Sequence, residues 1–197
     1  MTETRDKYIQ AAIQCFAEHG FYGTSVARIA EQLPYSKQAL LHHFGTKEKL
    51  YGEVLANISD RLSEQLSVND EGDLSDIDLL ESLFLNFLQH CVSHRNETQI
   101  LIRELMDNTQ RAEGAQNWYL KPFLEQLTSL VMNCAPDQFT SREKAFAFVY
   151  QLLGSISYFA ISETTLTQMY DEEMYERFAQ DYPAEIKKMI RARIEGS

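Results

Sequence analysis

Residues 24–51 read TSVARIAEQLPYSKQALLHHFGTKEKLY and decide the fold of the N-terminal part of the chain. The sequence LPYS at 33–36 separates two short segments that carry apolar residues at helical spacing. Pro34 disfavours helix at the residue before it, which ends the first segment. Ser36 is a good N-cap for a second helix, expected from Lys37 to about Phe44. The stretch therefore predicts two short helices joined by a four-residue turn, which is the layout of a helix-turn-helix.

A longer helix is expected before this motif. Apolar residues recur three and four positions apart from about Thr4 to His19, which predicts one amphipathic helix. Gly20 is its expected end, since glycine adopts the left-handed backbone conformation at little cost. Thr24 is then the expected N-cap of the next helix, which runs to about Gln32. Three helices with a shared apolar core are the result.

The predicted helix from Lys37 to Phe44 has two different faces. Leu40 and Phe44, four residues apart, are expected to point into the core. The opposite face carries Lys37, Gln38, Leu41 and His42. Lysine can donate to guanine, glutamine can pair with adenine, and an apolar side chain can contact a thymine methyl group. This face therefore predicts contact with base edges in a DNA major groove.

Helix ends beside this face are expected to bind phosphate. Backbone N–H groups at the starts of the second and fourth helices, with the hydroxyls of Ser25 and Thr46, form potential anion sites. Lys47 is expected in the first turn of the fourth helix, where its charge opposes the helix dipole. A bound phosphate would reverse that interaction, so we interpret Lys47 as a DNA contact. The alternative, ordinary surface residues on three packed helices, stays open.

The remainder of the chain shows helical periodicity only. The fourth helix is expected to continue to about Ser67, and the acidic stretch 68–73 is expected to be a loop. Further helices are predicted at about 76–94, 97–109, 117–134, 141–165 and 172–194, the last interrupted at Pro183. The fold class is therefore all-α, with an N-terminal three-helix helix-turn-helix domain, a helical C-terminal domain and about nine helices.

Charge is distributed unevenly along the chain, whose net charge is −11. Residues 1–50 carry six basic and five acidic side chains, whereas the rest carries twelve basic and twenty-four acidic ones. An acidic body is repelled by phosphate, so the N-terminal segment is the expected nucleic-acid contact.

Several absences in the sequence narrow the class of protein. No apolar run approaches the roughly 20 residues that span a bilayer, and the N-terminus lacks the apolar core of a signal peptide. The three cysteines show no paired spacing and are expected to be small buried side chains. We therefore expect a cytoplasmic protein with no membrane partner and no disulfide framework.

Three segments resemble the DNA-binding domain of TetR-family regulators: IQAAIQCFAEHG at 9–20, TSVARIA at 24–30 and SKQALLHHFGTKEKLY at 36–51. The resemblance implies a homodimeric repressor that a small-molecule inducer releases from a palindromic operator in double-stranded DNA, without a cofactor. It implies a DNA-binding domain at residues 1–46. Residues 47–197 would be the ligand-binding and dimerisation domain, with 47–67 as a linking helix.

By this resemblance, Lys37, Gln38, Leu41 and His42 match the family's base-facing positions, and Ser25, Arg28, Ser36 and Lys47 match its phosphate-contacting ones. The family's usual Gly-Val-Ser turn is Pro34-Tyr35-Ser36 here, which makes the turn stiffer. At the position where the family commonly has a tyrosine, this sequence has Leu41, which removes a hydroxyl contact. We hypothesise that Leu41 contacts a thymine methyl group; packing against the second helix is the alternative.

The inducer pocket that the resemblance implies would lie among helices from about 76 to 165. Candidate lining residues are Phe84, Phe87, Arg103, Met106, Trp118, Tyr119, Phe123 and Tyr150, with Tyr158 beside them. Arg103 is a possible anion anchor, although it could equally pair with an acid on a neighbouring helix. Aromatic residues at helical spacing also fit a plain core.

The segments 141–165 and 172–194 are the expected dimer helices. The first carries a broad apolar stripe of Phe146, Val149, Leu152, Leu153, Ile156 and Phe159, and Gly154-Ser155 would allow close helix approach. Paired helices of this kind form a four-helix interface in a two-fold dimer. A core helix of a single chain would show the same pattern.

An enzyme and an adaptor protein are the alternatives from other classes. His90, Cys91 and His94 could contribute to a metal site, but no nearby pair completes the four ligands of a closed zinc site. The sequence has no His-Glu-x-x-His, no phosphate-binding glycine loop and no nucleophile elbow. We therefore expect neither an enzyme nor a bound metal. An adaptor that keeps the helix-turn-helix fold would lack salt-dependent DNA affinity.

Overall fold

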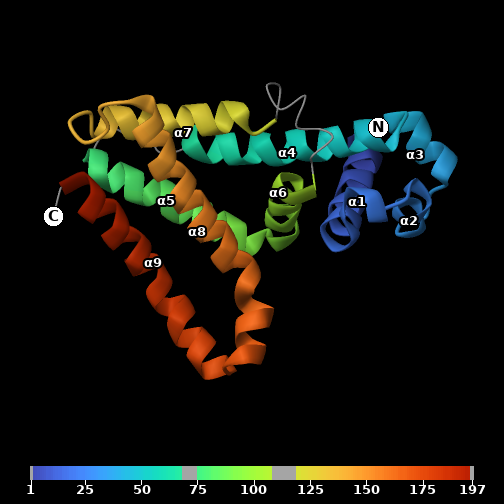
Figure 1. Cartoon of the computed structure of the whole chain (residues 1–197). Coiled ribbons are helices and arrows are strands. Elements are labelled where there is room, and N and C mark those ends of the chain that lie inside the picture. Colours follow the sequence, from blue (N-terminus) through green and yellow to red (C-terminus); the bar gives the residue numbers. More distant parts are fainter. Residues whose placement is uncertain (1, 68–74, 108–118, 196–197) are drawn as a thin grey trace. The chain divides into compact units, whose positions relative to one another are not determined.

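The computed structural model describes residues 2–67, 75–107 and 119–195 (Figure 1). Within these ranges the chain forms nine α-helices and no strand, so the all-α prediction is confirmed. The helices are α1 (Thr2–Gly23), α2 (Val26–Glu31), α3 (Lys37–Phe44), α4 (Lys47–Ser67), α5 (Asp76–Ser93), α6 (Arg95–Asp107), α7 (Lys121–Cys134), α8 (Arg142–Met169) and α9 (Glu172–Glu195). They belong to two compact units, one of residues 1–60 with 96–120 and the other of residues 61–95 with 121–197.

A change of backbone direction at Gly20 divides α1. Gly20 has φ 69° and ψ 175°, a conformation that side-chain-bearing residues rarely adopt, so the regular helix ends where the sequence predicts. Thr24 is buried, and its hydroxyl donates to the carbonyls of Cys15 at 2.9 Å and Gly20 at 2.8 Å. The prediction that Thr24 caps the second helix was therefore wrong, because Ser25 is the N-cap and accepts from the Arg28 N–H.

The helix-turn-helix is built around a small apolar core. Ile29 and Ala30 of α2 are buried, as are Leu40 and Phe44 of α3. Ser36 caps α3 by accepting from the Ala39 N–H at 3.1 Å, and α3 has the bounds that the sequence predicts. The two short helices therefore have one buried face each and leave the rest of their surface to solvent.

Helix α6 belongs to the same compact unit as α1–α3. The buried Tyr51 hydroxyl of α4 donates to Glu104 Oε2 of α6 at 2.8 Å. The Ser59 hydroxyl, also of α4, donates to the carbonyl of Tyr119 at 2.7 Å. These hydrogen bonds fasten α6 and Tyr119 to α4.

The second unit contains α5, α7, α8 and α9. Glu81 of α5 is buried and pairs with Arg191 of α9, with an Nε to Oε1 distance of 2.6 Å. Helix α9 continues through Pro183, so the predicted interruption was wrong. Proline removes one backbone donor, and the packing on both sides compensates for it. Ile186 is buried, and Tyr182 stacks on Phe159 with ring centroids 4.0 Å apart.

Helix α8 is apolar on more than one face. Val149, Leu152, Ile156 and Phe159 are buried in the core of the chain itself. These four were therefore assigned wrongly to the expected dimer stripe. The large apolar residues of α8 that face solvent are Phe146, Tyr150, Tyr158 and Met169. A 3.6-residue period cannot select a face when apolar residues occur all around the helix.

By length and composition, α8 also qualifies as a membrane span, although the sequence predicted no apolar run of that length. Of its most apolar 18-residue window, 44% is buried inside the structure. A core helix of a globular protein meets the same criterion, and α8 packs against α5, α7 and α9.

The three cysteines lie in the described residues and form no disulfide. Cys15 and Cys91 are buried, as predicted, whereas Cys134 is half-buried. Burial, with a smaller contribution from the Asp76 carboxylate, raises the pKa of the Cys134 thiol to about 11. Cys134 is therefore a thiol, rather than a thiolate, at neutral pH.

Candidate nucleic-acid interface

The two faces of α3 differ in exposure as the sequence predicts. Leu40 and Phe44 are 0% and 3% exposed. Lys37, Gln38 and His42 are exposed on the other side of the helix. Leu41 is half-buried, so the structure is compatible with both hypotheses about it. The polar face of α3 is available to a partner, and its contact with bases stays a prediction.

Tyr8 of α1 fixes the position of α3, and sequence reasoning missed it. Tyr8 is fully buried, and its ring centroid lies 5.5 Å from Tyr35 of the turn, 5.7 Å from His43 and 6.1 Å from Phe44. Burial, and secondarily the nearby Tyr35, raise the pKa of the Tyr8 hydroxyl. The signal was its position four residues before Ala12, on the apolar face of the helix.

Three hydroxyl side chains cap the helix N-termini around α3. Ser25 and Ser36 cap α2 and α3, and Thr46 Oγ1 accepts from the Lys49 N–H at 3.2 Å. All three are exposed, as is Arg28. These residues therefore lie at the surface beside helix N-termini, which is where phosphate binding requires them.

The N-terminus of α4 already holds a carboxylate. Glu48 accepts a hydrogen bond from its own backbone N–H and a weaker one from the Thr46 hydroxyl, and both lower the pKa of its carboxyl group. A lowered carboxyl pKa is expected at a helix N-terminus, because the partial positive charge there favours the ionised carboxylate. A phosphate at Thr46 would have to share these donors with Glu48.

Lys47 has a structural partner that the sequence did not reveal. Its Nζ donates to the carbonyls of Phe21 at 2.9 Å and Thr24 at 3.1 Å, and it lies 4.2 Å from the centre of the Phe21 ring. The ammonium therefore stabilises the carbonyl groups at the end of α1. An ammonium has three N–H donors, so one is left for a phosphate, and that contact stays a prediction.

The candidate inducer residues fall into different environments. Phe84, Phe87 and Phe123 are buried in the second unit, with the Phe87 and Phe123 rings 6.1 Å apart. Tyr150 and Tyr158 are exposed on α8. Arg103, Met106 and Tyr119 belong to the first unit, and Trp118 lies outside the described residues. The role of these residues stays a prediction.

The histidines near the end of α5 face each other. The His90 and His94 rings stack with centroids 4.4 Å apart, and His94 is the C-cap of the helix. Across residues 2–67, 75–107 and 119–195, no group of three or more His, Cys, Asp and Glu side chains is placed to hold a metal ion.

Helices α1–α3, with the exposed polar face of α3, have the architecture of a helix-turn-helix domain. Residues 9–54 match the family model described as "Bacterial regulatory proteins, tetR family". The N-terminal segment of the chain is therefore similar to the DNA-binding domain of the TetR family.

Curated relatives match the N-terminal part of the chain. The HTH-type transcriptional repressor AcnR of Corynebacterium efficiens is 39% identical over 66 residues, which are 34% of this chain and 35% of AcnR. The biofilm operon icaADBC negative transcriptional regulator IcaR of Staphylococcus aureus is 30% identical over 84 residues, 43% of this chain and 45% of IcaR. The chain thus matches less than half the length of these relatives.

Solved structures resemble the fold along nearly the whole chain. A TetR-like transcriptional regulator from Rhodococcus sp. RHA1 has a TM-score of 0.68 at 18% identity, covering 98% of this chain and 96% of that one. FadR from Bacillus subtilis, in complex with stearoyl-CoA, has a TM-score of 0.72 at 15% identity, covering 97% and 98%. The chain therefore has the all-helical fold of these TetR-like structures.

Proposed function

We propose that this protein is a sequence-specific DNA-binding transcriptional repressor that inserts α3 into the major groove. The observation that carries the proposal is the division of α3. Leu40 and Phe44 hold the helix in the core, while Lys37, Gln38 and His42 are exposed on its other side. A short helix with such a free polar face is the element that helix-turn-helix proteins place against base edges.

Each exposed group has a chemical role in this proposal. Lys37 donates to guanine, Gln38 pairs with adenine, and Leu41 contacts a thymine methyl group, with His42 as a further donor or acceptor. The phosphate contacts are Ser25, Arg28, Ser36, Thr46 and Lys47, which lie at helix ends or exposed beside them. The DNA-binding domain comprises residues 1–46, and 47–67 link it to the body.

The solvent face of α8 supports a homodimer. Phe146 and Tyr150 stack there with ring centroids 5.8 Å apart, and Tyr158 is 73% exposed. Gly154 lies on the same helix, and a Cβ atom built on it would meet nothing within 4 Å. Glycine inside a helix costs about 0.5–1 kcal/mol relative to alanine, and no neighbour among the described residues requires a glycine at this position. A second α8 that packs closely against this one would require a glycine there. We therefore place the dimer interface on 141–165 and 172–194.

The proposed inducer binds in the helical body of residues 47–197. The similar FadR structure is in complex with stearoyl-CoA, whose acyl chain is apolar, and this supports a ligand with an apolar chain in this fold. Phe84, Phe87 and Phe123 are the buried aromatic candidates, whereas Tyr150 is exposed and belongs to the proposed dimer face of α8. Binding of the inducer is proposed to release the protein from its palindromic operator. The proposed location of the protein is the cytoplasm.

Selection of binding sites from random DNA with the full-length protein tests the proposal. We expect a palindromic consensus whose half-sites lie about 34 Å apart, or a multiple of this. Affinity for that site should fall linearly on a log–log plot against salt, with a slope of about −0.9 per phosphate contact. Failure to enrich any sequence, with no salt-dependent DNA affinity, would instead support the adaptor.

A further inference from the structure

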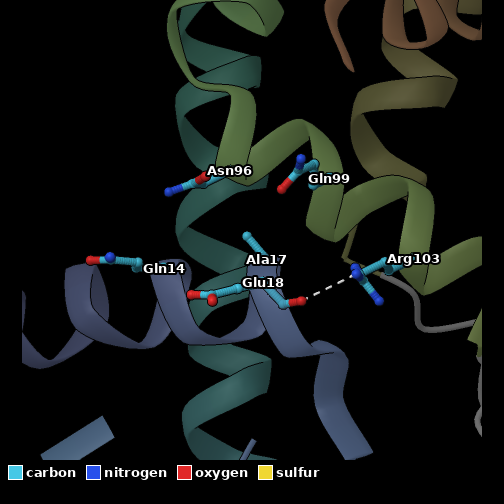
Figure 2. Close-up of a pocket in the computed structure, with 6 residues that line it drawn as sticks. All are labelled: Gln14, Ala17, Glu18, Asn96, Gln99 and Arg103. Carbon is cyan, nitrogen blue, oxygen red and sulfur yellow. Dashed lines mark hydrogen bonds between the residues drawn. The ribbon is translucent and has the colours of Figure 1, made fainter. Parts of the chain in front are cut away.

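A polar hollow lies between α1 and α6, inside the first compact unit (Figure 2). Its volume is about 370 Å³, within the range of roughly 300–1,000 Å³ that small-ligand sites occupy. The lining residues are Gln14, Ala17 and Glu18 of α1 and Asn96, Gln99 and Arg103 of α6. Figure 2 shows the α6 side chains on one side of the hollow and the α1 side chains on the other. The aromatic inducer candidates are absent from this lining.

Arg103 supplies the positive charge of the hollow. Its Nη2 donates to the backbone carbonyl of Glu18 at 3.3 Å, a long hydrogen bond to a neutral acceptor (Figure 2). The neighbouring Glu104 is buried, and its carboxylate accepts a hydrogen bond from the Tyr51 hydroxyl. A guanidinium has five N–H donors, which leaves most of them available to a ligand.

Carboxamides supply the other donors. No hydrogen bond to any described residue holds the side-chain amides of Gln14, Asn96 and Gln99, all of which line the hollow. Asn96 is also in the first turn of α6, but the same turn carries the buried Glu97, so the helix N-terminus adds no net positive charge. The Arg103 guanidinium and the three amides are the groups that favour a small hydrophilic anion.

One group opposes an anion in this hollow. The Glu18 side chain carries a carboxylate, with Oε1 3.6 Å from His19 Nε2. That side chain is 66% exposed, so water screens much of its charge. We therefore expect the carboxylate to weaken anion binding without preventing it. Removing the Glu18 charge should then strengthen anion binding, whereas removing the Arg103 charge should weaken it.

We propose that this hollow binds a small hydrophilic anion, a carboxylate or a phosphate, which takes the Arg103 guanidinium from the Glu18 carbonyl. A charge-assisted hydrogen bond is about twice as strong as one to a neutral carbonyl, so the anion is the better acceptor. Its binding loosens the contact between α6 and the end of α1. If the proposed DNA function holds, the anion thereby lowers DNA affinity from the hollow between α1 and α6, apart from the aromatic inducer candidates.

The first experiment measures anion binding without DNA. Full-length protein labelled with ¹⁵N is titrated with sodium acetate or sodium phosphate, and sodium chloride keeps the ionic strength constant. We expect saturable shifts of the Arg103 Nε–H signal and of the Gln14, Asn96 and Gln99 amide signals. Saturation by acetate or by phosphate identifies the source of the anion. Shifts that do not saturate with either probe would overturn the site.

Two variants with opposite expected effects separate binding from folding. Arg103→Met should weaken binding by about tenfold or more, because it removes the charge-assisted hydrogen bond. Glu18→Gln leaves the backbone carbonyl in place and should strengthen binding by roughly 1.5- to fivefold. The control is Glu64→Gln, the same change at an exposed position of α4 outside the hollow. If Glu18→Gln and Glu64→Gln bind the anion equally, the proposed location is wrong.

A second experiment tests the effect on DNA. At constant ionic strength, the saturating anion should lower the affinity of the wild-type protein for its selected site and leave Arg103→Met unaffected. An unchanged wild-type affinity would overturn the regulatory role. Because the first experiment needs no DNA, failure of the proposed function would appear only in the second.

Discussion

Helices α3 and α8 both present surface that the chain itself leaves uncovered, but the two surfaces differ in chemistry. On α3 the buried face is apolar and the exposed face carries Lys37, Gln38 and His42. On α8 the buried face is apolar as well, yet large apolar side chains such as Tyr158 are also exposed. A polar free face matches the hydrogen-bonding edges of base pairs, whereas an apolar one matches another apolar surface. In the function that we propose, α3 contacts DNA and α8 contacts a second copy of the chain.

The largest effect is expected from charge on the free face of α8. Tyr158→Asp would bury a carboxylate in the dimer interface, which should weaken dimerisation by about 3 kcal/mol or more. Sedimentation at micromolar concentration should then show a monomer. The matched control is Gln126→Asp, at an exposed position of α7, which should remain dimeric. If Tyr158→Asp also sediments as a dimer, this face of α8 is not the interface.

The two faces of α3 should separate folding from function. Leu40→Ala removes a fully buried side chain and should lower the free energy of unfolding by about 2–5 kcal/mol. Gln38→Ala, at an exposed position, should change it by no more than about 0.5 kcal/mol. Urea denaturation measures both values. Equal destabilisation by the two substitutions would contradict the division of the helix.

Leu41 is the residue at the boundary between the faces of α3. If it contacts a thymine methyl group, replacing that thymine by uracil should cost about 1 kcal/mol, or roughly fivefold in affinity. The Leu41→Ala variant should bind the thymine and uracil operators equally. Direct titration of the two DNAs decides the matter, and equal affinity of the wild-type protein for both would favour packing against α2.

The Gly154→Ala substitution should give the smallest effect. Whether it stabilises or destabilises the protein depends on whether a second α8 packs against this position. In a monomeric Tyr158→Asp background, Gly154→Ala should raise the free energy of unfolding by about 0.5–1 kcal/mol, because alanine favours helix and the site is open. In the wild-type background the added methyl group should weaken the dimer. A gain in both backgrounds would show that no second helix approaches Gly154.

The sequence predicts α3 well because its signals are local. Pro34, Ser36 and Gly45 delimit it, and the spacing of Leu40 and Phe44 orients it. The same reasoning selected the wrong face of α8, because apolar residues surround that helix and burial is decided by α5, α7 and α9. Local signals therefore suffice where polar and apolar residues segregate.

Charged residues with distant partners could not be placed from the sequence. Lys47 donates to carbonyls 23 and 26 positions away, and Arg103 to one 85 positions away. A sequence shows that a cation is present but not which backbone carbonyl will accept from it. From the sequence, we interpreted both residues as possible contacts for an anion. The structure shows that each of them also donates to a backbone carbonyl near the end of α1.

The affinity of α3 for its selected operator is the most direct test of the account. The triple variant Lys37→Ala, Gln38→Ala and His42→Ala removes three exposed side chains and should keep the wild-type Tm. Because each good base contact contributes about 1–3 kcal/mol of discrimination, its binding should fall at least about 100-fold, to the level of unrelated DNA. A folded triple variant that binds the operator as tightly and selectively as the wild type would contradict the assignment of α3 as the reading helix.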